Sequence, residues 1–220
     1  MKARAFRDRR DAGRRLAALL DGEGLRRERA VVLGIPRGGL VVAFEVARAL
    51  KAPLDLVCVR PLSTPDEPGL HLGAVGEAGA PVLNAELARG AGVAGSALDR
   101  LVTAERSTLA EQERRYRAVR PRLPLAGRTA LLVDDGVTTG TSAIAAARGA
   151  KARGPRRVVL AVPVSSPEAL DAVAGEVDEV VCLEHPPLTL ALEEWYEEFP
   201  EVSSQEVLAL LAQAARWPWG

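Results

Sequence analysis

The sequence predicts an α/β fold, with a parallel sheet of about five strands flanked by helices. Short apolar runs typical of buried strands alternate with segments of helical periodicity over most of the chain. The length of 220 residues suits one such domain, and the 48% share of hydrophobic residues is enough for a substantial core. The sequence contains no internal repeat and no low-complexity linker. We therefore expect a single domain over residues 1–220, with its core at about 25–185.

The expected strands are the apolar runs at 31–35, 54–59, 129–136, 157–164 and 179–184. Helical spacing of apolar residues predicts helices over 4–20, 40–50, 96–118, 139–153 and 167–174. A stretch rich in Pro and Gly, 60–82, interrupts this alternation, and connections of that length are usually functional or mobile. We expect a flexible loop there, mobile over 61–72, in which GAVGEAG and APVLN pair as a short hairpin. Residues from about 185 to 220 should form a small cap together with the N-terminal helix.

Composition and charge exclude several classes of protein. The 29 basic and 29 acidic residues cancel, which removes the electrostatic case for a nucleic-acid-binding protein. No run of 18 apolar residues and no signal sequence is present, so we expect a cytoplasmic protein without a membrane partner. Cys58 and Cys182 lie in apolar runs and should be buried free thiols. With only His71 and His185 beside them, no zinc-binding spacing exists.

The most informative segment is LLVDDGVTTGTS, residues 131–142, where two acids follow an apolar strand and a Gly/Thr turn leads into a helix. In open α/β sheets, ligands bind at the carboxyl ends of the strands. Such a turn presents backbone N–H groups and hydroxyls at a helix N-terminus, which favours a phosphate. Carboxylates repel phosphate but accept hydrogen bonds from the two hydroxyls of a ribose. Asp134 and Asp135 followed by this turn therefore predict a ribose-5-phosphate site.

These residues carry a family resemblance. VDDGVTTGTS resembles the phosphoribosyl pyrophosphate motif of the type I phosphoribosyltransferases, and GIPRGGLVVAFEVARAL resembles the pyrophosphate loop of that family. The order of elements is similar over roughly residues 30–185, and the tail with EEWYEEF resembles a bacterial group of stand-alone phosphoribosyltransferase-like proteins. The resemblance implies a transferase of nucleotide metabolism. It would move ribose-5-phosphate between phosphoribosyl pyrophosphate and a small nitrogenous base or nucleotide.

The resemblance also assigns roles to individual residues. It implies that the ribose hydroxyls are held by Asp134 and Asp135, and the pyrophosphate by Arg37, Gly38 and Gly39. It assigns the 5′-phosphate to Thr138, Thr139, Gly140 and Thr141, with backbone contributions from Gly136 and Val137. Mg²⁺ would be held mainly through the diphosphate and ribose oxygens of the substrate, so we expect no dedicated set of protein ligands.

Two positions differ from the family pattern. Relatives usually carry Lys where Pro61 closes the second strand, and members of the bacterial group carry an acid at the place of Gly69. Arg60 is then the cation expected to stabilise the leaving diphosphate, and we count it with Asp134 and Asp135 as catalytic. His71 is the remaining loop residue able to act on a proton or on the diphosphate. These differences leave open an alternative function, a non-catalytic regulatory protein that binds phosphoribosyl pyrophosphate or a nucleotide.

The nature of the base is only partly constrained. The 6-oxopurine enzymes carry Asp where this chain has Thr138, which argues against hypoxanthine and guanine. Trp195 and Tyr196 could stack on a base or, as we favour, anchor the cap on the core. His185 could face the base or be structural. The apolar stripe of the helix at 96–118 could join a homodimer.

Overall fold

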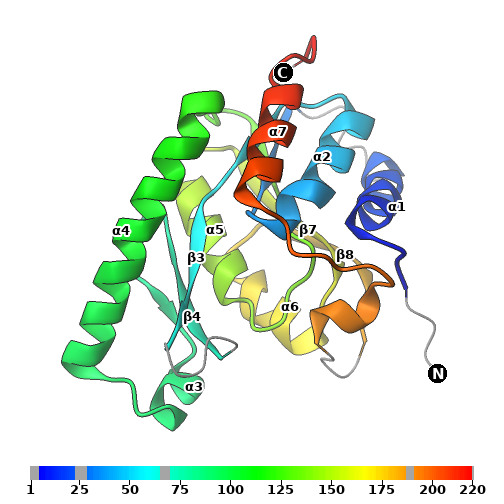
Figure 1. The fold of residues 1–220 in the computed structure, drawn as a ribbon. Helices are drawn as coiled ribbons and strands as arrows, with labels where there is room; N and C mark the ends of the chain where they lie inside the picture. Colours follow the sequence, from blue (N-terminus) through cyan, green and yellow to red (C-terminus); the bar gives the residue numbers. More distant parts are fainter. Residues whose placement is uncertain (1–4, 23–28, 65–69, 187–190, 220) are drawn as a thin grey trace.

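The computed structural model describes residues 5–22, 29–64, 70–186 and 191–219. A five-stranded sheet has the order β2-β1-β6-β7-β8, and all its neighbouring strands are parallel (Figure 1). Its strands are β1 (Ala30–Gly34), β2 (Leu54–Leu56), β6 (Thr129–Val133), β7 (Arg157–Val164) and β8 (Glu179–Glu184). The predicted parallel sheet flanked by helices is confirmed.

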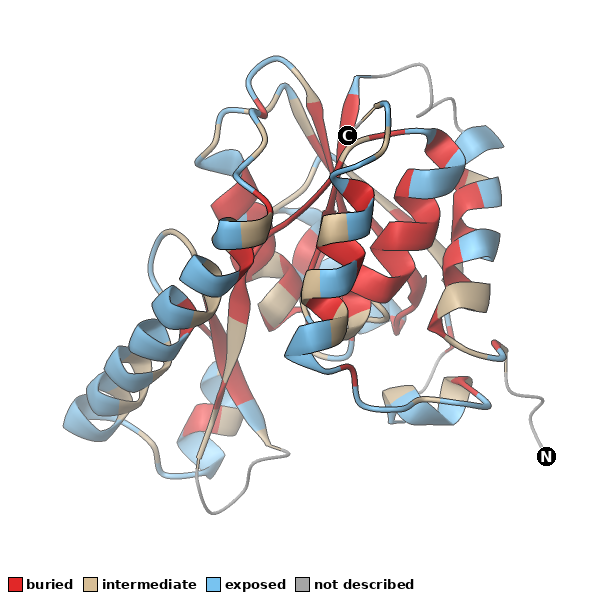
Figure 2. Cartoon of the chain, turned by 45° about the horizontal axis from the view of Figure 1, so that its top comes forward, coloured by how far each residue is buried: buried red, intermediate tan, exposed pale blue. Residues whose placement is uncertain are grey.

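Helices cover both faces of this sheet. One face packs against α1 (Arg9–Gly22), α2 (Gly38–Leu50) and α7 (Ser204–Ala214), which stand together in Figure 1. The other face packs against α5 (Thr141–Lys151) and α6 (Pro167–Ala174). Successive side chains of a strand point to opposite faces, so Val32 joins the first core whereas Val31 and Leu33 join the second. Because both faces are covered, β1, β6 and β7 are buried along nearly their whole length rather than alternating between buried and exposed residues (Figure 2).

The second apolar run, expected as one strand over 54–59, divides between two sheets. β2 ends at Leu56, and β3 (Val59–Ser63) begins a separate antiparallel sheet with β4 (His71–Gly76) and β5 (Val82–Leu83). The predicted hairpin is present, since Ala74 pairs with Val82. Much of the expected loop is thus sheet, and Pro61 is tolerated because β3 is an edge strand. The predicted mobility of 61–72 falls partly on 65–69, which lie outside the described residues.

The small sheet, α3 (Ala85–Gly90) and α4 (Gly95–Val119) form an arm beside the central sheet, on the left of Figure 1. α4 buries only Leu109 and Tyr116, and most of its surface is exposed (Figure 2). The arm therefore depends on few apolar contacts along α4.

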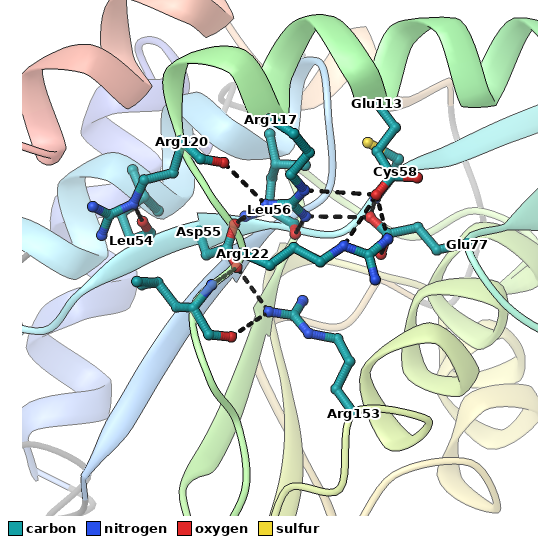
Figure 3. A network of polar contacts seen from close by, with 11 residues as sticks. Leu54, Asp55, Leu56, Cys58, Glu77, Glu113, Arg117, Arg120, Arg122 and Arg153 are labelled. Atoms are coloured by element: carbon teal, nitrogen blue, oxygen red, sulfur yellow. Dashed lines mark hydrogen bonds and ion pairs between the residues drawn. The ribbon is translucent and has the colours of Figure 1, made fainter.

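Buried charges attach this arm to the sheet (Figure 3). The carboxylate of Asp55, on β2, has no exposed surface and accepts hydrogen bonds from Arg117 (2.5 Å) and Arg153 (2.8 Å). Glu77, just after β4, pairs with Arg117 at 3.5 Å and with Arg122 at 3.0 Å. Removing one partner from such a buried set leaves an uncompensated charge, which is strongly destabilising. The network therefore fixes the position of α4 relative to β4.

The N-terminal segment and the segment after residue 190 lie against each other. Phe6 forms a parallel bridge with Tyr196, and their ring centroids are 5.4 Å apart. A short 3-10 helix, η2 (Leu192–Trp195), precedes this contact. Among the described residues, no helix is both long and apolar enough to cross a membrane.

Candidate functional site

The two acids stand at the carboxyl end of β6, in the middle of the sheet. β6 ends at Val133, whose carbonyl accepts the N–H of Ile35 at 2.9 Å, so the loops that follow β1 and β6 start side by side. Asp134 accepts the N–H of Asp135 through Oδ1 at 2.9 Å. This bond orients the carboxylate of Asp134.

The backbone of the loop Pro36-Arg37-Gly38-Gly39 lies directly against the side chains of the two acids. A Cβ on Gly38 would lie 2.0 Å from Oδ2 of Asp135, and a Cβ on Gly39 would lie 2.5 Å from Oδ1 of Asp134. At Gly39 the Cβ would also meet backbone atoms of Val133 and Asp134, so only glycine fits there, whereas at Gly38 the side chain of Asp135 would have to move. The Pro36–Arg37 peptide bond is cis. The structure thus brings together the two motifs that the sequence singled out.

Arg9 is a site residue that the sequence analysis did not identify. Its Nε donates to Oδ2 of Asp135 at 2.6 Å, and its Nη1 donates to the carbonyl of Pro200 at 2.6 Å. The guanidinium lies 3.6 Å from the centroid of the Phe199 ring. Only 10% of the Arg9 side chain and 13% of the Asp135 side chain are exposed, so the pair is largely desolvated.

Burial and charge act on the other acid. Burial disfavours the ionised form of Asp134, and the negative charge of Asp135 adds to this, so the pKa of Asp134 lies well above 3.8. A carboxyl group whose pKa rises on folding stabilises the fold while it is protonated. That stabilisation is lost as the pH rises from the unfolded pKa through the folded one. At neutral pH the acid therefore costs stability.

We expect Asp134→Asn to raise the free energy of unfolding at pH 7, because the amide keeps the bond to Asp135 N–H without a charge to desolvate. The gain should shrink as the pH falls towards the unfolded pKa of 3.8. Urea unfolding at several pH values measures it, with the exposed Asp99→Asn as control. Equal or lower stability of Asp134→Asn at pH 7 would contradict this electrostatic account.

The Thr loop, residues 138–141, enters α5 without a side-chain cap. The N-cap is Gly140, with φ of 80°, which has no side chain to accept a hydrogen bond from the first turn. The hydroxyls of Thr139 and Thr141 are 3.2 Å apart. The N–H of Val137 donates to the carbonyl of Val164, so the fold itself uses this donor. The helix start thus presents N–H groups and hydroxyls where an anion is favoured.

Most of the expected site residues line two separate pockets, whereas Asp135, Gly38 and Gly39 line neither of them. The first, called here the Thr-loop pocket, has a volume of about 160 Å³ and is lined by His71, Asp134, Leu192 and residues 136–143. The second, the arginine pocket, measures about 390 Å³ and lies between α4, α7, Arg37 and Arg60. Gly38 and Gly39, which touch the acids, directly follow Arg37. His71, a residue of the predicted flexible loop, thus lies beside the Thr loop.

Three arginines line the second pocket, namely Arg37, Arg60 and Arg115, and each has a carboxylate partner, which for Arg115 is Glu111. Arg60, on β3, donates through Nε to Glu105 of α4 at 2.8 Å, and 34% of its side chain is exposed. Arg37 donates to Glu201 at 2.5 Å. Because Glu105 and Glu201 keep solvent contact, an anion entering the pocket can replace them at modest cost.

A family model described as the phosphoribosyl transferase domain matches residues 6–197. The chain belongs to this family. The matched part of the phosphoribosyl transferase domain includes Arg9, the loop at 36–39, the acids and the Thr loop. The resemblance drawn from the two sequence motifs is therefore confirmed.

Three relatives are similar in sequence to this phosphoribosyl transferase domain over most of its length. Proteins from two strains of Mycobacterium tuberculosis, named provisionally as phosphoribosyl transferases, are 45% identical over 214 residues, or 96% of this chain. The chain covers 47% of each, so it spans about half the length of these curated relatives. A protein of Thermus thermophilus with a crystal structure is 46% identical, with a TM-score of 0.76. That match covers 96% of this chain and 98% of the other.

Tyr196 and Trp195 differ in burial, although both pack in the cluster that contains Phe6. Tyr196 is 1% exposed, packs against Phe6 and Phe199, and donates its hydroxyl to the carbonyl of Asp135 at 2.5 Å. Burial raises the pKa of Tyr196, so the hydroxyl stays a donor. It anchors the cap on the domain. Trp195 instead lines a small pocket with Thr138. His185 is exposed, and residues 187–190 lie outside the described part.

Proposed function

We propose that this domain transfers ribose-5-phosphate between phosphoribosyl pyrophosphate and a small nitrogenous base. One observation carries the proposal: the acid pair touches the Gly38-Gly39 backbone on one side and runs into the Thr loop on the other. A ribose bound through its hydroxyls to Asp134 and Asp135 can then reach an anion site with its 5′-phosphate. Its diphosphate extends towards the loop that carries Arg37.

The 5′-phosphate is assigned to Thr138, Thr139, Gly140 and Thr141. The uncapped start of α5 supports this assignment, because its N–H groups and partial positive charge suit a dianion. Threonine hydroxyls at 139 and 141 add further donors. The backbone of Gly136 lines the same pocket.

Arg9 serves as a positioning residue in this proposal. The Arg9–Asp135 pair at 2.6 Å leaves Asp135 Oδ1 for a ribose hydroxyl and fixes the orientation of the carboxylate. Tyr196 holds the backbone of the same residue. Positioning of this kind supplies a large part of the barrier reduction in reactions between two bound substrates.

In the reaction, the bond from ribose C1 to the diphosphate oxygen breaks, a bond from C1 to the base nitrogen forms, and the proton on that nitrogen is lost to solvent. In the transition state, positive charge develops on the ribose ring and negative charge accumulates on the departing diphosphate. Arg60 and Arg37, which both line the arginine pocket, supply the cations that stabilise the departing diphosphate. Mg²⁺ bound to the substrate would neutralise part of the diphosphate charge.

In this proposal the metal ion arrives with the substrate. In the described part of the chain, no three His, Cys, Asp or Glu side chains cluster so that they could hold a metal ion. The two acids at the end of β6 can still contact the water or ribose oxygens around Mg²⁺. Magnesium dependence, a homodimer and a cytoplasmic location belong to this proposal.

A regulatory protein that binds phosphoribosyl pyrophosphate without turnover is the second candidate. Two observations favour it: Pro61 occupies the usual place of a lysine, and Arg60 is held by Glu105. The acid pair and the Thr loop serve binding equally well in both candidates.

A base screen separates the two. The protein is incubated with phosphoribosyl pyrophosphate, Mg²⁺ and adenine, orotate, hypoxanthine or guanine, and pyrophosphate release is followed. We expect pyrophosphate release with adenine or orotate and none with hypoxanthine or guanine. The reason is that Thr138 stands where the enzymes acting on 6-oxopurines use Asp. Binding of phosphoribosyl pyrophosphate without release for any base would favour the regulatory function.

A further inference from the structure

A third pocket lies at the opposite edge of the sheet, where β1 and β6 begin. Its volume is about 610 Å³, larger than either pocket at the proposed transfer site. Ala30, the first residue of β1, and Arg128, next to β6, line it together with the end of α2. We call it the basal pocket. A volume of this size holds ordinary small-molecule ligands.

The walls of the basal pocket are positively charged. Arg29, Lys51 and Arg128 line it, and none of the described lining residues is acidic. Within the described residues, these three cations form no ion pair, in contrast to Arg37 and Arg60. The carboxyl end of α2 contributes roughly half a negative charge, which three full positive charges outweigh. The pocket therefore favours an anion with more than one charge.

An aromatic ring completes the wall. Trp219 lines the basal pocket, with its ring centroid 5.7 Å from that of Trp217. Trp217 in turn packs 5.0 Å from Phe44 of α2. This chain of rings supports Trp219 from the core, beyond the end of α7 at the top of Figure 1. A supported indole ring is a stacking surface for a planar ligand.

We propose that the basal pocket binds a nucleotide. Its phosphates would contact Arg29, Lys51 and Arg128, and its base would stack on Trp219. Charge alone would suit any polyanion, and the ring alone any aromatic molecule. A nucleotide carries both features in one molecule of suitable size. The site is distinct from the transfer site and does not depend on the transferase proposal.

Its place in the fold connects it to the transfer site. β1 and β6, each five residues long, run from the basal pocket to the 36–39 loop and to the acids. At 3.3 Å per residue this is about 17 Å. α2 likewise begins at Gly38, beside Asp135, and ends next to Lys51 in the pocket wall. A ligand in the basal pocket thus contacts the far ends of three elements that form the transfer site.

Titration calorimetry with ATP, in the absence of Mg²⁺, tests the proposal. We expect one site per chain with a Kd below about 1 mM. The double variant Lys51→Asn/Arg128→Gln should weaken ATP at least about 10-fold, because it removes two of three cations. Asn tolerates the left-handed backbone of Lys51, whose φ is 52°. Arg14→Gln, an exposed change on α1, is the control and should not change the affinity.

Two comparisons make the test specific. Trp219→Leu should weaken ATP about 10-fold and leave inorganic tripolyphosphate unchanged, because only the base stacks. Asp135→Asn, at the transfer site, should leave ATP binding intact. The proposal is overturned by absent ATP binding, by unchanged affinity in the double variant, or by equal loss of ATP and tripolyphosphate in Trp219→Leu. Loss of ATP binding in Asp135→Asn would overturn it too, by placing the nucleotide at the transfer site.

Discussion

We expect Gly39→Ala to weaken the binding of phosphoribosyl pyrophosphate by about 100-fold, or about 2.8 kcal/mol. The new Cβ would lie 2.5 Å from Oδ1 of Asp134, 2.7 Å from its Cα and 3.0 Å from the carbonyl of Val133. Two of these three atoms are backbone, so no side-chain rotation relieves the clash. The loop and the acids must move apart, and the protein should also lose about 1–3 kcal/mol of stability.

Gly22→Ala is the matched control for this prediction. It makes the same change at the end of α1, where a Cβ meets no atom within 4 Å. Calorimetry with phosphoribosyl pyrophosphate and urea unfolding should distinguish the two variants. Wild-type affinity in a folded Gly39→Ala protein would refute the direct contact between this loop and the ribose-binding acids.

Replacing Arg60 with alanine is expected to lower kcat/KM by about 100-fold once a base that supports turnover is found. One preorganised donor to a developing negative charge is worth about 3 kcal/mol. Arg60 lines the pocket that Arg37 also lines, and its partner Glu105 stays solvent-accessible. The loss should appear mainly in kcat, because the charge on the diphosphate increases as the C1 bond breaks.

Two further variants sharpen this result. Arg106→Ala removes an arginine from the same helix that carries Glu105, but this arginine bonds the carbonyl of Gly79, and its loss should leave kcat/KM unchanged. Pro61→Lys supplies the cation usual in the family and should maintain or raise activity. Normal turnover of Arg60→Ala would remove the role given to Arg60. Activity that appears only in Pro61→Lys would favour the regulatory function.

The sequence was sufficient for the features that are local in the chain. Asp134, Asp135 and the Thr loop lie within one strand-turn-helix segment, so their residue types and order are enough to predict an anion site next to two acids. The buried strands and α6 were likewise predicted from short apolar patterns. At α6 the expected range, 167–174, is the observed one.

Features that depend on distant contacts were missed. Arg9 pairs with a residue 126 positions away, and no local pattern shows that contact. One signal was present, since Arg9 lies in the same helical stripe as the buried Ala12, Gly13 and Leu16. An arginine in an apolar stripe needs a buried partner.

The division of residues 54–59 between two sheets has a similar cause. The pairing of Val59 with Gly76 moves β3 away from the central sheet. The apolar pattern of the run gives no sign of this pairing. The network around Asp55 and Arg117 was hidden for the same reason, since its residues are up to 98 positions apart.

Calorimetric titration of phosphoribosyl pyrophosphate with Mg²⁺ into the wild-type protein and Asp135→Asn measures whether the acid pair holds the ribose. We expect one binding site per chain in the wild type and at least about 10-fold weaker binding in the variant, or about 1.4 kcal/mol. Asp178→Asn, a change at the far edge of the sheet beside Val158, serves as the control. Absent binding in the wild type, or equal affinity in Asp135→Asn, would contradict the assignment of the acid pair to the ribose.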